Sequence, residues 1–505
     1  MRFALLSAWL LVFSAESFAG AEQPRLFQLE VVDSETGRGV PLVQLTTTHH
    51  QMLVTDSAGR VAIRDPEMMG QEIHFQIKSH GYQFPADGFG YRGKTVRIDP
   101  GGKAKIEIDR INIAERLYRV TGAGIYSDSV ALGHTPPLVK PLNNALITGC
   151  DSVLMAPYRG KLYWFWGDTS RWKYPLGNFQ VTGATSELPE SGGLNPDQGI
   201  DFTYFQNEEG FVKSMAEMPG DGPTWAWGLI SLTDDDGQEH LIAGYEKVRG
   251  LETHRRGLIR FDDDQQAFTL VKELDKDIPL YLQGHPLRHT DGDTDYFYFG
   301  DPYAVMRVEA NVDAILDPAK YEGFTCLQPG NRRAEAEVDR DAEGNVVWGW
   351  KRDTAAIDSK LQDELVKQRK LKLQERWIQL TDIESGDPVT AHRGSVAWNE
   401  YRQRWILITA QIGGRSMLGE VWYAEADAPE GPWKAARRIV THDNYSFYNP
   451  KQHPQFAQQD GKVIYFEGTY THTFSGNPVP TPKYDYNQMM YRLNLEDERL
   501  REVQN

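Results

Sequence analysis

Five carboxylates occupy comparable places in a pattern that recurs along the chain. Asp151, Asp168, Glu246, Asp301 and Glu467 each lie where an apolar, strand-like run begins or ends. The most apolar of these runs, GKLYWFWGDT, ends at Asp168. A turn is the structural alternative at each position, because Asp side chains bond nearby backbone groups. Carboxylates that converge on one site would instead supply the acid and the base or nucleophile that hydrolyse a glycosidic bond.

The spacing of these residues leads us to expect particular roles. Asp151 begins the first unit of the pattern and is the predicted base or nucleophile. Asp301 or Glu467 would be the acid, with a pKa raised by burial or by a neighbouring carboxylate. Asp168 and Glu246 are predicted to bind substrate. The distance between the two reacting carboxyl groups decides between retention and inversion, so the stereochemistry stays open.

Other side chains at the same places would contact a substrate. His285 and His453 each precede a proline at the start of a unit, and Arg393 has the matching place in the fourth unit. The histidines would bind substrate, act as an acid or hold a cation, unless they are structural. Arg393 would suit an anionic sugar, such as a uronate or a sulfated sugar. Trp172 and Trp227 are predicted sugar platforms, with core packing as the alternative.

These residues are positioned by an internal repeat of strand, turn and apolar strand. The five copies begin CDSVLMAPYRG, GLISLTDDDG, HPLRHTDGDT, GSVAWNEYRQ and HPQFAQQDG. A four-stranded propeller blade takes about 40–50 residues, and the copies are spaced widely enough for blades with insertions. Closed radial repetition also protects sheet edges. The sequence therefore predicts an all-β protein with a five-bladed β-propeller over residues 125–500, whose strand ends gather at one mouth.

Two further segments complete the predicted architecture. Residues 355–380 have apolar side chains at steps of mostly three and four residues, which predicts a helical insertion between blades. Residues 24–113 contain short Val-, Leu- and Thr-rich runs separated by DSETGRG and DSAGR. Such closely spaced strand and turn signals predict a small β-sandwich.

Both parts resemble known families. The motifs D-x-x-T-G-x-x-V-P and T-D-x-x-G, at residues 33–41 and 55–59, resemble transthyretin-like or carboxypeptidase-regulatory accessory domains. The segment GCDSVLMAPYRGKLYWFWGDT resembles the opening of the bacterial endo-D-arabinanase family, and the layout resembles the five-bladed propeller glycoside hydrolases of the arabinanase and invertase clans.

The second resemblance implies roles for three carboxylates. It makes Asp151 the base or nucleophile, because an Asp at the start of the first inner strand has that role in these propellers. The segment FGDP around Asp301 resembles the Arg-Asp-Pro element of the invertases, with Gly300 in place of the arginine. The Glu-Cys or Glu-Gly-Pro element that carries the acid has no clean match, and Glu467 in FEGTY takes that place by position.

Composition excludes some partners and suggests a location. The net charge of −17 argues against nucleic acid, which requires a basic face. Residues 1–21 have a positive start, a short apolar stretch and an Ala-Gly-Ala cleavage site. They predict a signal peptide and a secreted or periplasmic protein, with no transmembrane segment. The two cysteines, Cys150 and Cys326, could pair or stay free.

The sequence predicts no cofactor. The acidic stretch 290–295 raises a structural calcium ion, but it lacks the spacing of an EF-hand loop, and a hairpin turn is the favoured interpretation. The leading functional hypothesis is a secreted glycoside hydrolase acting on a polysaccharide or oligosaccharide. The competing hypothesis is a non-catalytic carbohydrate-binding or surface-interaction propeller. The sugar, its linkage and the oligomeric state are not encoded in any motif of the chain.

Overall fold

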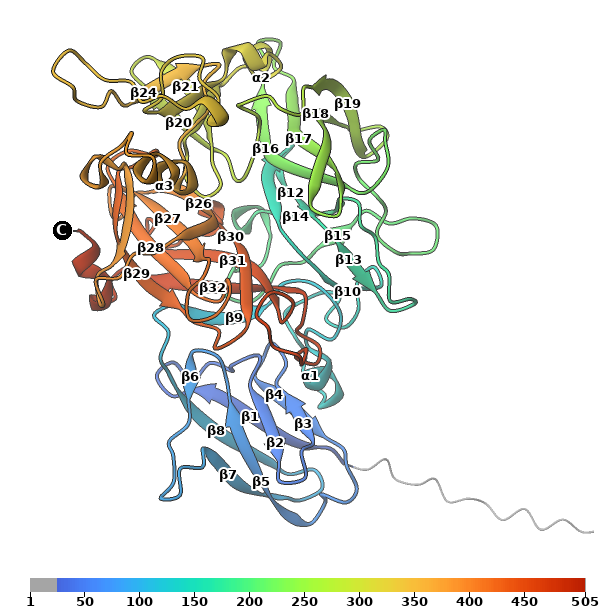
Figure 1. Ribbon diagram of the computed structural model, residues 1–505. Helices are drawn as coiled ribbons and strands as arrows, with labels where there is room; N and C mark the ends of the chain where they lie inside the picture. The colour runs from blue at the N-terminus through green and yellow to red at the C-terminus, as the bar shows by residue number, and fades with distance from the viewer. Residues whose placement is uncertain (1–24, 505) are drawn as a thin grey trace, which may run out of the picture.

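The computed structural model describes residues 25–504, which fold almost entirely into β-strands (Figure 1). This confirms the all-β class. The predicted signal peptide, residues 1–21, lies outside the described residues. Within them, no helix is both long and apolar enough to cross a membrane.

The N-terminal strands form two four-stranded sheets that share one hydrophobic core. One sheet has the order β4 (Arg60–Ile63), β1 (Phe27–Asp33), β8 (Lys103–Arg110) and β6 (Tyr82–Gln83). The other has the order β3 (Met52–Val54), β2 (Gln44–Thr47), β5 (Gln71–Lys78) and β7 (Gly93–Ile98). Leu29, Leu45 and Phe75, from both sheets, are fully buried in the shared core. Figure 1 shows these strands as a lobe beneath the other sheets.

Five further sheets have four or five strands each. Sheet 1 contains β11 (Leu154–Tyr158), β12 (Lys161–Trp166), β14 (Thr182–Ser186) and β15 (Thr203–Tyr204), and sheet 2 contains β16 (Thr224–Thr233), β17 (Glu239–Arg249), β18 (Glu252–Asp262) and β19 (Ala267–Leu274). Sheet 3 contains β20 (Leu287–Asp291), β21 (Thr294–Phe299), β22 (Met306–Glu309), β23 (Glu322–Thr325) and β24 (Gly349–Arg352), and sheet 4 contains β25 (Ile378–Asp382), β26 (Ala391–Asn399), β27 (Arg404–Gln411), β28 (Val421–Ala426) and β29 (Trp433–Val440). Sheet 5 contains β9 (Glu115–Arg119), β30 (Ser446–Gln452), β31 (Val463–Thr471) and β32 (Asn487–Asn494).

Each of these sheets packs against the next through a buried core. Separate clusters join sheets 1 and 2, 2 and 3, 3 and 4, and 4 and 5. A fifth cluster, with Trp164 of β12 and Tyr465 of β31, joins sheet 5 back to sheet 1. The strands β11, β16, β20, β26 and β30 line one cavity of about 530 Å³. These five strands therefore surround this cavity, which we call the axial cavity, and we call the five strands the first strands.

The predicted helical insertion over residues 355–380 is only partly helical. The helix α3 covers Ser359–Lys367, with the Asp358 side chain accepting the Leu361 N–H at its N-terminus. After a 3₁₀ turn at Leu373–Glu375, the chain forms strand β25, parallel to β29. Ile378 and Leu380 alternate with more exposed residues, which is the period of a strand. The prediction was wrong for this last segment.

Strand β9 changes the predicted domain boundary. A propeller beginning at residue 125 leaves out β9, yet β9 pairs with β32 and completes sheet 5. The internal repeat predicted from the sequence does not include β9, whose partner strand β32 lies at the other end of the chain. Two short helices near the sheets were also not predicted, α1 (Ser127–Ala131) and α2 (Val312–Ile315). Cys150 and Cys326 are both buried free thiols.

Candidate active site

Asp151 and Asp168 are held side by side by backbone hydrogen bonds. Strand β10 (Ile147–Cys150) pairs with β13 (Thr169–Arg171), and the two aspartates extend this pairing at its end. The Asp151 N–H donates to the Asp168 carbonyl at 3.2 Å, and the Gly167 N–H donates to the Asp151 carbonyl at 2.9 Å. A Cβ atom on Gly167 would lie 2.4 Å from Asp151 Oδ1. The glycine in the Trp-Gly-Asp-Thr segment therefore leaves the space that the Asp151 carboxylate occupies.

The surroundings of the pair shift both carboxylates. Burial raises the pKa of Asp151, while hydrogen bonds from the Tyr448 and Tyr486 hydroxyls oppose this rise. The Tyr448 hydroxyl donates to Asp151 Oδ2 at 2.7 Å. Burial and the Asp151 charge raise the pKa of Asp168 to about 7. Asp168 Oδ1 is buried without a hydrogen-bond partner. One carboxylate with donors beside another that holds a proton near neutrality can do acid–base work.

Asp301 forms an ion pair with Arg393. Asp301 Oδ2 lies 2.8 Å from the Arg393 guanidinium, which stacks over the Trp227 ring at 4.5 Å. Burial raises the pKa of Asp301, and the positive charge of Arg393 opposes that rise. Three of the predicted site residues, from sheets 2, 3 and 4, are thus brought together.

Glu246 is also neutralised by an arginine. Its Oε1 accepts from Arg256 Nη2 at 2.6 Å and from Arg256 Nε at 3.1 Å, and its Oε2 accepts from Thr253 at 3.2 Å. The Arg256 guanidinium stacks on Tyr281 at 3.5 Å. Both oxygens of the Glu246 carboxylate therefore accept hydrogen bonds, and we assign Glu246 a structural role.

Glu467 and His453 lie in the interior. Glu467 Oε1 is 2.8 Å from His453 Nε2, and neither side chain has exposed surface. Burial raises the pKa of Glu467 to about 8 and lowers that of His453. A substrate cannot touch either side chain in this arrangement, because the two fill the space between sheets 1 and 5. His285, by contrast, lines the axial cavity.

Trp172 is exposed beside the aspartate pair. Trp172 is 67% exposed. It lines a cavity of about 590 Å³ together with Gly149, Ser170 and Tyr486. Tyr486 also bonds Asp151, so one residue of the cavity wall contacts the aspartate pair. No motif in the sequence predicted that Tyr486 would belong to the site. It precedes β32 near the end of the chain, and only the packing of sheet 5 on sheet 1 brings it to Asp151.

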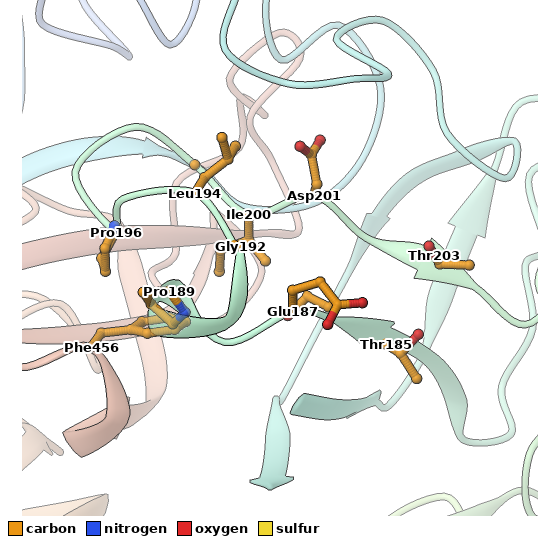
Figure 2. Close-up of a pocket in the computed structure, with 13 residues that line it drawn as sticks. Thr185, Glu187, Pro189, Gly192, Leu194, Pro196, Ile200, Asp201, Thr203 and Phe456 are labelled. Atoms are coloured by element: carbon orange, nitrogen blue, oxygen red, sulfur yellow. The ribbon is translucent and has the colours of Figure 1, made fainter. Parts of the chain in front are cut away.

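A smaller cavity lies at the outer edge of sheet 1, away from these residues. It measures about 220 Å³ and is lined by the loop around Gly192 and by Thr185 and Thr203 (Figure 2). Its two carboxylates have partners: Glu187 pairs with Lys161 at 2.7 Å, and Asp201 accepts the Val139 N–H at 2.8 Å. It offers no free acid–base pair.

The acidic stretch 290–295 forms the hairpin turn between β20 and β21, as predicted. Asp291 pairs with Arg307, and Asp295 pairs with Arg288. Across residues 25–504, no group of three or more His, Cys, Asp or Glu side chains is placed to hold a metal ion.

Comparisons with known proteins give distant matches. No family model and no curated protein matches the sequence. Glycoside hydrolases are among the similar solved structures. A GH43_1 enzyme from Xanthomonas citri is 11% identical over 68% of this chain and 87% of its own, with a TM-score of 0.33. An exo-beta-1,3-galactanase from Phanerochaete chrysosporium is 9% identical over 71% and 62%, with a TM-score of 0.36.

A protein of unknown function from Dyadobacter fermentans is 8% identical over 77% of this chain and 85% of its own, with a TM-score of 0.32. At these identities and TM-scores, the matches do not assign a function to this protein.

Proposed function

We propose that this protein is a glycoside hydrolase whose reacting carboxylates are Asp151 and Asp168. The observation that carries the proposal is the pair itself. Two aspartates are fixed side by side, one bonded by tyrosine hydroxyls and the other with a pKa of about 7. Tyr486, which bonds Asp151, lines a cavity of about 590 Å³ together with an exposed tryptophan, Trp172.

The two carboxyl groups would divide the chemistry according to their surroundings. Asp151 accepts hydrogen bonds from tyrosines, which favour its charged form, so it would act as base or nucleophile. Asp168 would hold a proton near neutral pH and donate it to the leaving oxygen. The role predicted for Glu467 as the acid passes to Asp168, because Glu467 is buried. Asp301 is the second candidate acid, although its Arg393 partner favours ionisation.

The remaining predicted residues would bind the sugar chain. Trp172 would provide a flat apolar face beside the reacting pair, and Trp227 with Arg393 would provide a second contact. The charged groups around the Trp172 cavity have polar partners: Lys483 Nζ lies 2.5 Å from Asp128 Oδ2, and Asp485 Oδ1 lies 2.8 Å from His472 Nδ1. A neutral polysaccharide or oligosaccharide therefore suits this cavity better than a uronate.

Finer features of the architecture and location belong to the same proposal. We infer that the five sheets are the blades of a β-propeller, since each packs on its neighbours around the five first strands. The two N-terminal sheets would be an accessory sandwich. Residues 1–21 would direct export and be removed.

A non-catalytic sugar-binding role is the second candidate, and one observation favours it. Asp301 and Glu246, two of the five predicted carboxylates, each form an ion pair with an arginine and are not free to act as acid or base.

Release of reducing ends from a panel of neutral polysaccharides separates the two functions. We expect the wild type to cleave at least one polymer, and Asp151→Asn to lose activity by at least a hundredfold while keeping its melting temperature. The exposed, turn-located Asp235→Asn is the matched control. Binding of a polymer without cleavage by the wild type, or full activity of Asp151→Asn, would overturn the proposed hydrolase.

A further inference from the structure

The axial cavity is separate from the aspartate pair. It is lined by residues in the later halves of the long first strands, including Leu229–Thr233 of β16 and Ser395–Trp398 of β26. The group formed by Asp301, Arg393 and Trp227 uses the earlier halves of the same strands, with Trp227 in β16 and Arg393 in β26. The cavity of about 530 Å³ therefore lies toward the opposite ends of the first strands.

Lys451 places an ammonium group at this cavity. The residue is 8% exposed and lines the cavity from β30. Its Nζ donates to the Gln452 carbonyl at 3.3 Å. An ammonium group has three donors, and no carboxylate lies within ion-pair distance of Lys451 among residues 25–504. A buried charge with so few partners is costly, which makes an anion a favourable occupant.

The groups that face Lys451 compensate its charge only in part. Glu467, from β31, is the carboxylate that acts on it. Burial raises the pKa of Glu467 to about 8, which favours the protonated form of this side chain at about pH 6. His285 lines the same cavity with a buried, unpartnered Nδ1. His453 lies near Lys451, and Arg393 lies near His285, but neither side chain carries a negative charge that could balance Lys451.

Apolar side chains form part of the walls of the cavity. Two further charged residues line it, and each has a partner: Glu239 accepts from the Arg159 N–H and from Ser231, and Arg288 pairs with Asp295. Leu229, Phe297 and Val396 line it, and Trp398 stands partly exposed at its side. A ligand that fits must therefore join one negative group to a short apolar body. We propose that the axial cavity is a binding site for a small carboxylate, with its oxygens on Lys451 and its hydrocarbon part against Leu229, Phe297 and Val396.

Calorimetric titration with sodium butyrate tests this site. At about pH 6, where a lysine of lowered pKa is still charged, we expect one butyrate per chain. Burial lowers the pKa of Lys451 to about 8, so binding should weaken at least tenfold at about pH 9.5. Lys451→Met should weaken it at least tenfold at about pH 6, whereas the exposed Lys434→Met should not. Should Lys451→Met fail to fold, Lys451→Gln is measured in its place.

The result is distinguishable from the catalytic proposal. Asp151→Asn should bind butyrate as the wild type does, because Asp151 does not line the axial cavity. No butyrate binding by the wild type, or equal binding by the Lys451 variants, would overturn the proposed site. Equal affinity for sodium chloride would show a general anion site and contradict the carboxylate assignment.

Discussion

Gly167 decides whether Asp151 can lie beside Asp168. Its missing Cβ leaves room for Asp151 Oδ1, and its backbone N–H bonds the Asp151 carbonyl. A single methyl group at this position would displace the carboxylate, although the backbone conformation there does not require glycine. The reacting geometry at the residue scale thus depends on a residue with no functional group of its own.

Gly167→Ala should therefore lower kcat/KM by about tenfold to a hundredfold, since a misplacement of about 1 Å has effects of that size. The melting temperature should change little, because the residue is half-buried. The matched control is Gly349→Ala, where an added Cβ meets nothing within 4 Å. Equal activity of Gly167→Ala and the wild type would show that the position of Asp151 does not limit the reaction.

The sequence predicts Asp151 as the base or nucleophile but Asp168 only as a substrate-binding residue, and it does not predict the surroundings of either. Asp151 and Asp168 stand out because each adjoins an apolar strand. Tyr486 and the burial of Glu467 depend on contacts between sheets 1 and 5, which are far apart in the chain. Glu246 and Asp301 carried no sign of their arginine partners, because Arg256 and Arg393 come from other strands.

At the scale of elements, the segment from Ser359 to Asp382 shows how a local pattern changes without a break in apolar content. The helix α3 buries Leu361 and Leu365, one turn apart, whereas β25 buries Ile378 and Leu380, two residues apart. Arg369, with φ of 61°, follows the C-cap residue Gln368 and turns the chain. The helix could be predicted from its periodicity, but its end could not, because apolar steps of three and four residues continue into the strand.

The start of α3 depends on its cap. Asp358→Ala removes the acceptor of the Leu361 N–H and should lower the free energy of unfolding by about 1 kcal/mol. Activity should stay unchanged, because α3 packs on the core between sheets 3 and 4, away from the aspartate pair. Urea unfolding of this variant beside the exposed Lys360→Ala measures the effect. A loss no larger than that of the control would show that the cap adds no stability.

At the scale of the whole molecule, the N-terminal lobe and the five sheets form one packed body. The Arg116 guanidinium, from β9, donates to the Pro41 carbonyl at 2.9 Å and to the His80 carbonyl at 2.9 Å. The His80 ring lies 2.8 Å from the Tyr470 hydroxyl in sheet 5. A buried arginine that loses its acceptors is strongly destabilising.

Truncation tests this dependence. A chain beginning at residue 125 lacks β9 and should unfold or aggregate, because sheet 5 then has an unpaired edge at β32. A chain beginning at residue 113 keeps β9, so a larger fraction of it should be folded than of the chain from residue 125, although Arg116 is then exposed. Circular dichroism and size-exclusion chromatography compare the two. A folded, active chain from residue 125 would contradict the role of β9.

The interface between the lobe and the sheets also responds to pH. His442 is buried near His80, with its ring bonded to the Gly419 carbonyl and the Tyr491 hydroxyl at 2.8 Å each. Burial lowers its pKa from 6.5 to about 3. Because the unfolded chain binds a proton more readily, His442 costs stability as the pH falls from about 6.5 towards 3.

Comparison with His442→Gln isolates this effect from the buried carboxylates, whose raised pKa values act in the opposite direction. Between about pH 7.5 and 5.5, the wild type should lose about 1.4 kcal/mol more unfolding free energy than the variant. Urea unfolding at both pH values measures the difference. Parallel pH dependence of the two proteins would show that His442 is protonated in the folded state.

Varying the leaving group tests whether Asp168 protonates it while Asp151 reacts ionised. Once a cleaved sugar is known, the turnover of wild type and Asp168→Asn is compared on its natural glycoside and on an aryl glycoside with an acidic phenol. We expect Asp168→Asn to lose about 10²–10⁴-fold on the natural glycoside, as general-acid catalysis would require, and far less on the aryl glycoside, whose leaving group needs no proton. Equal losses on both substrates, or no loss on either, would contradict this assignment.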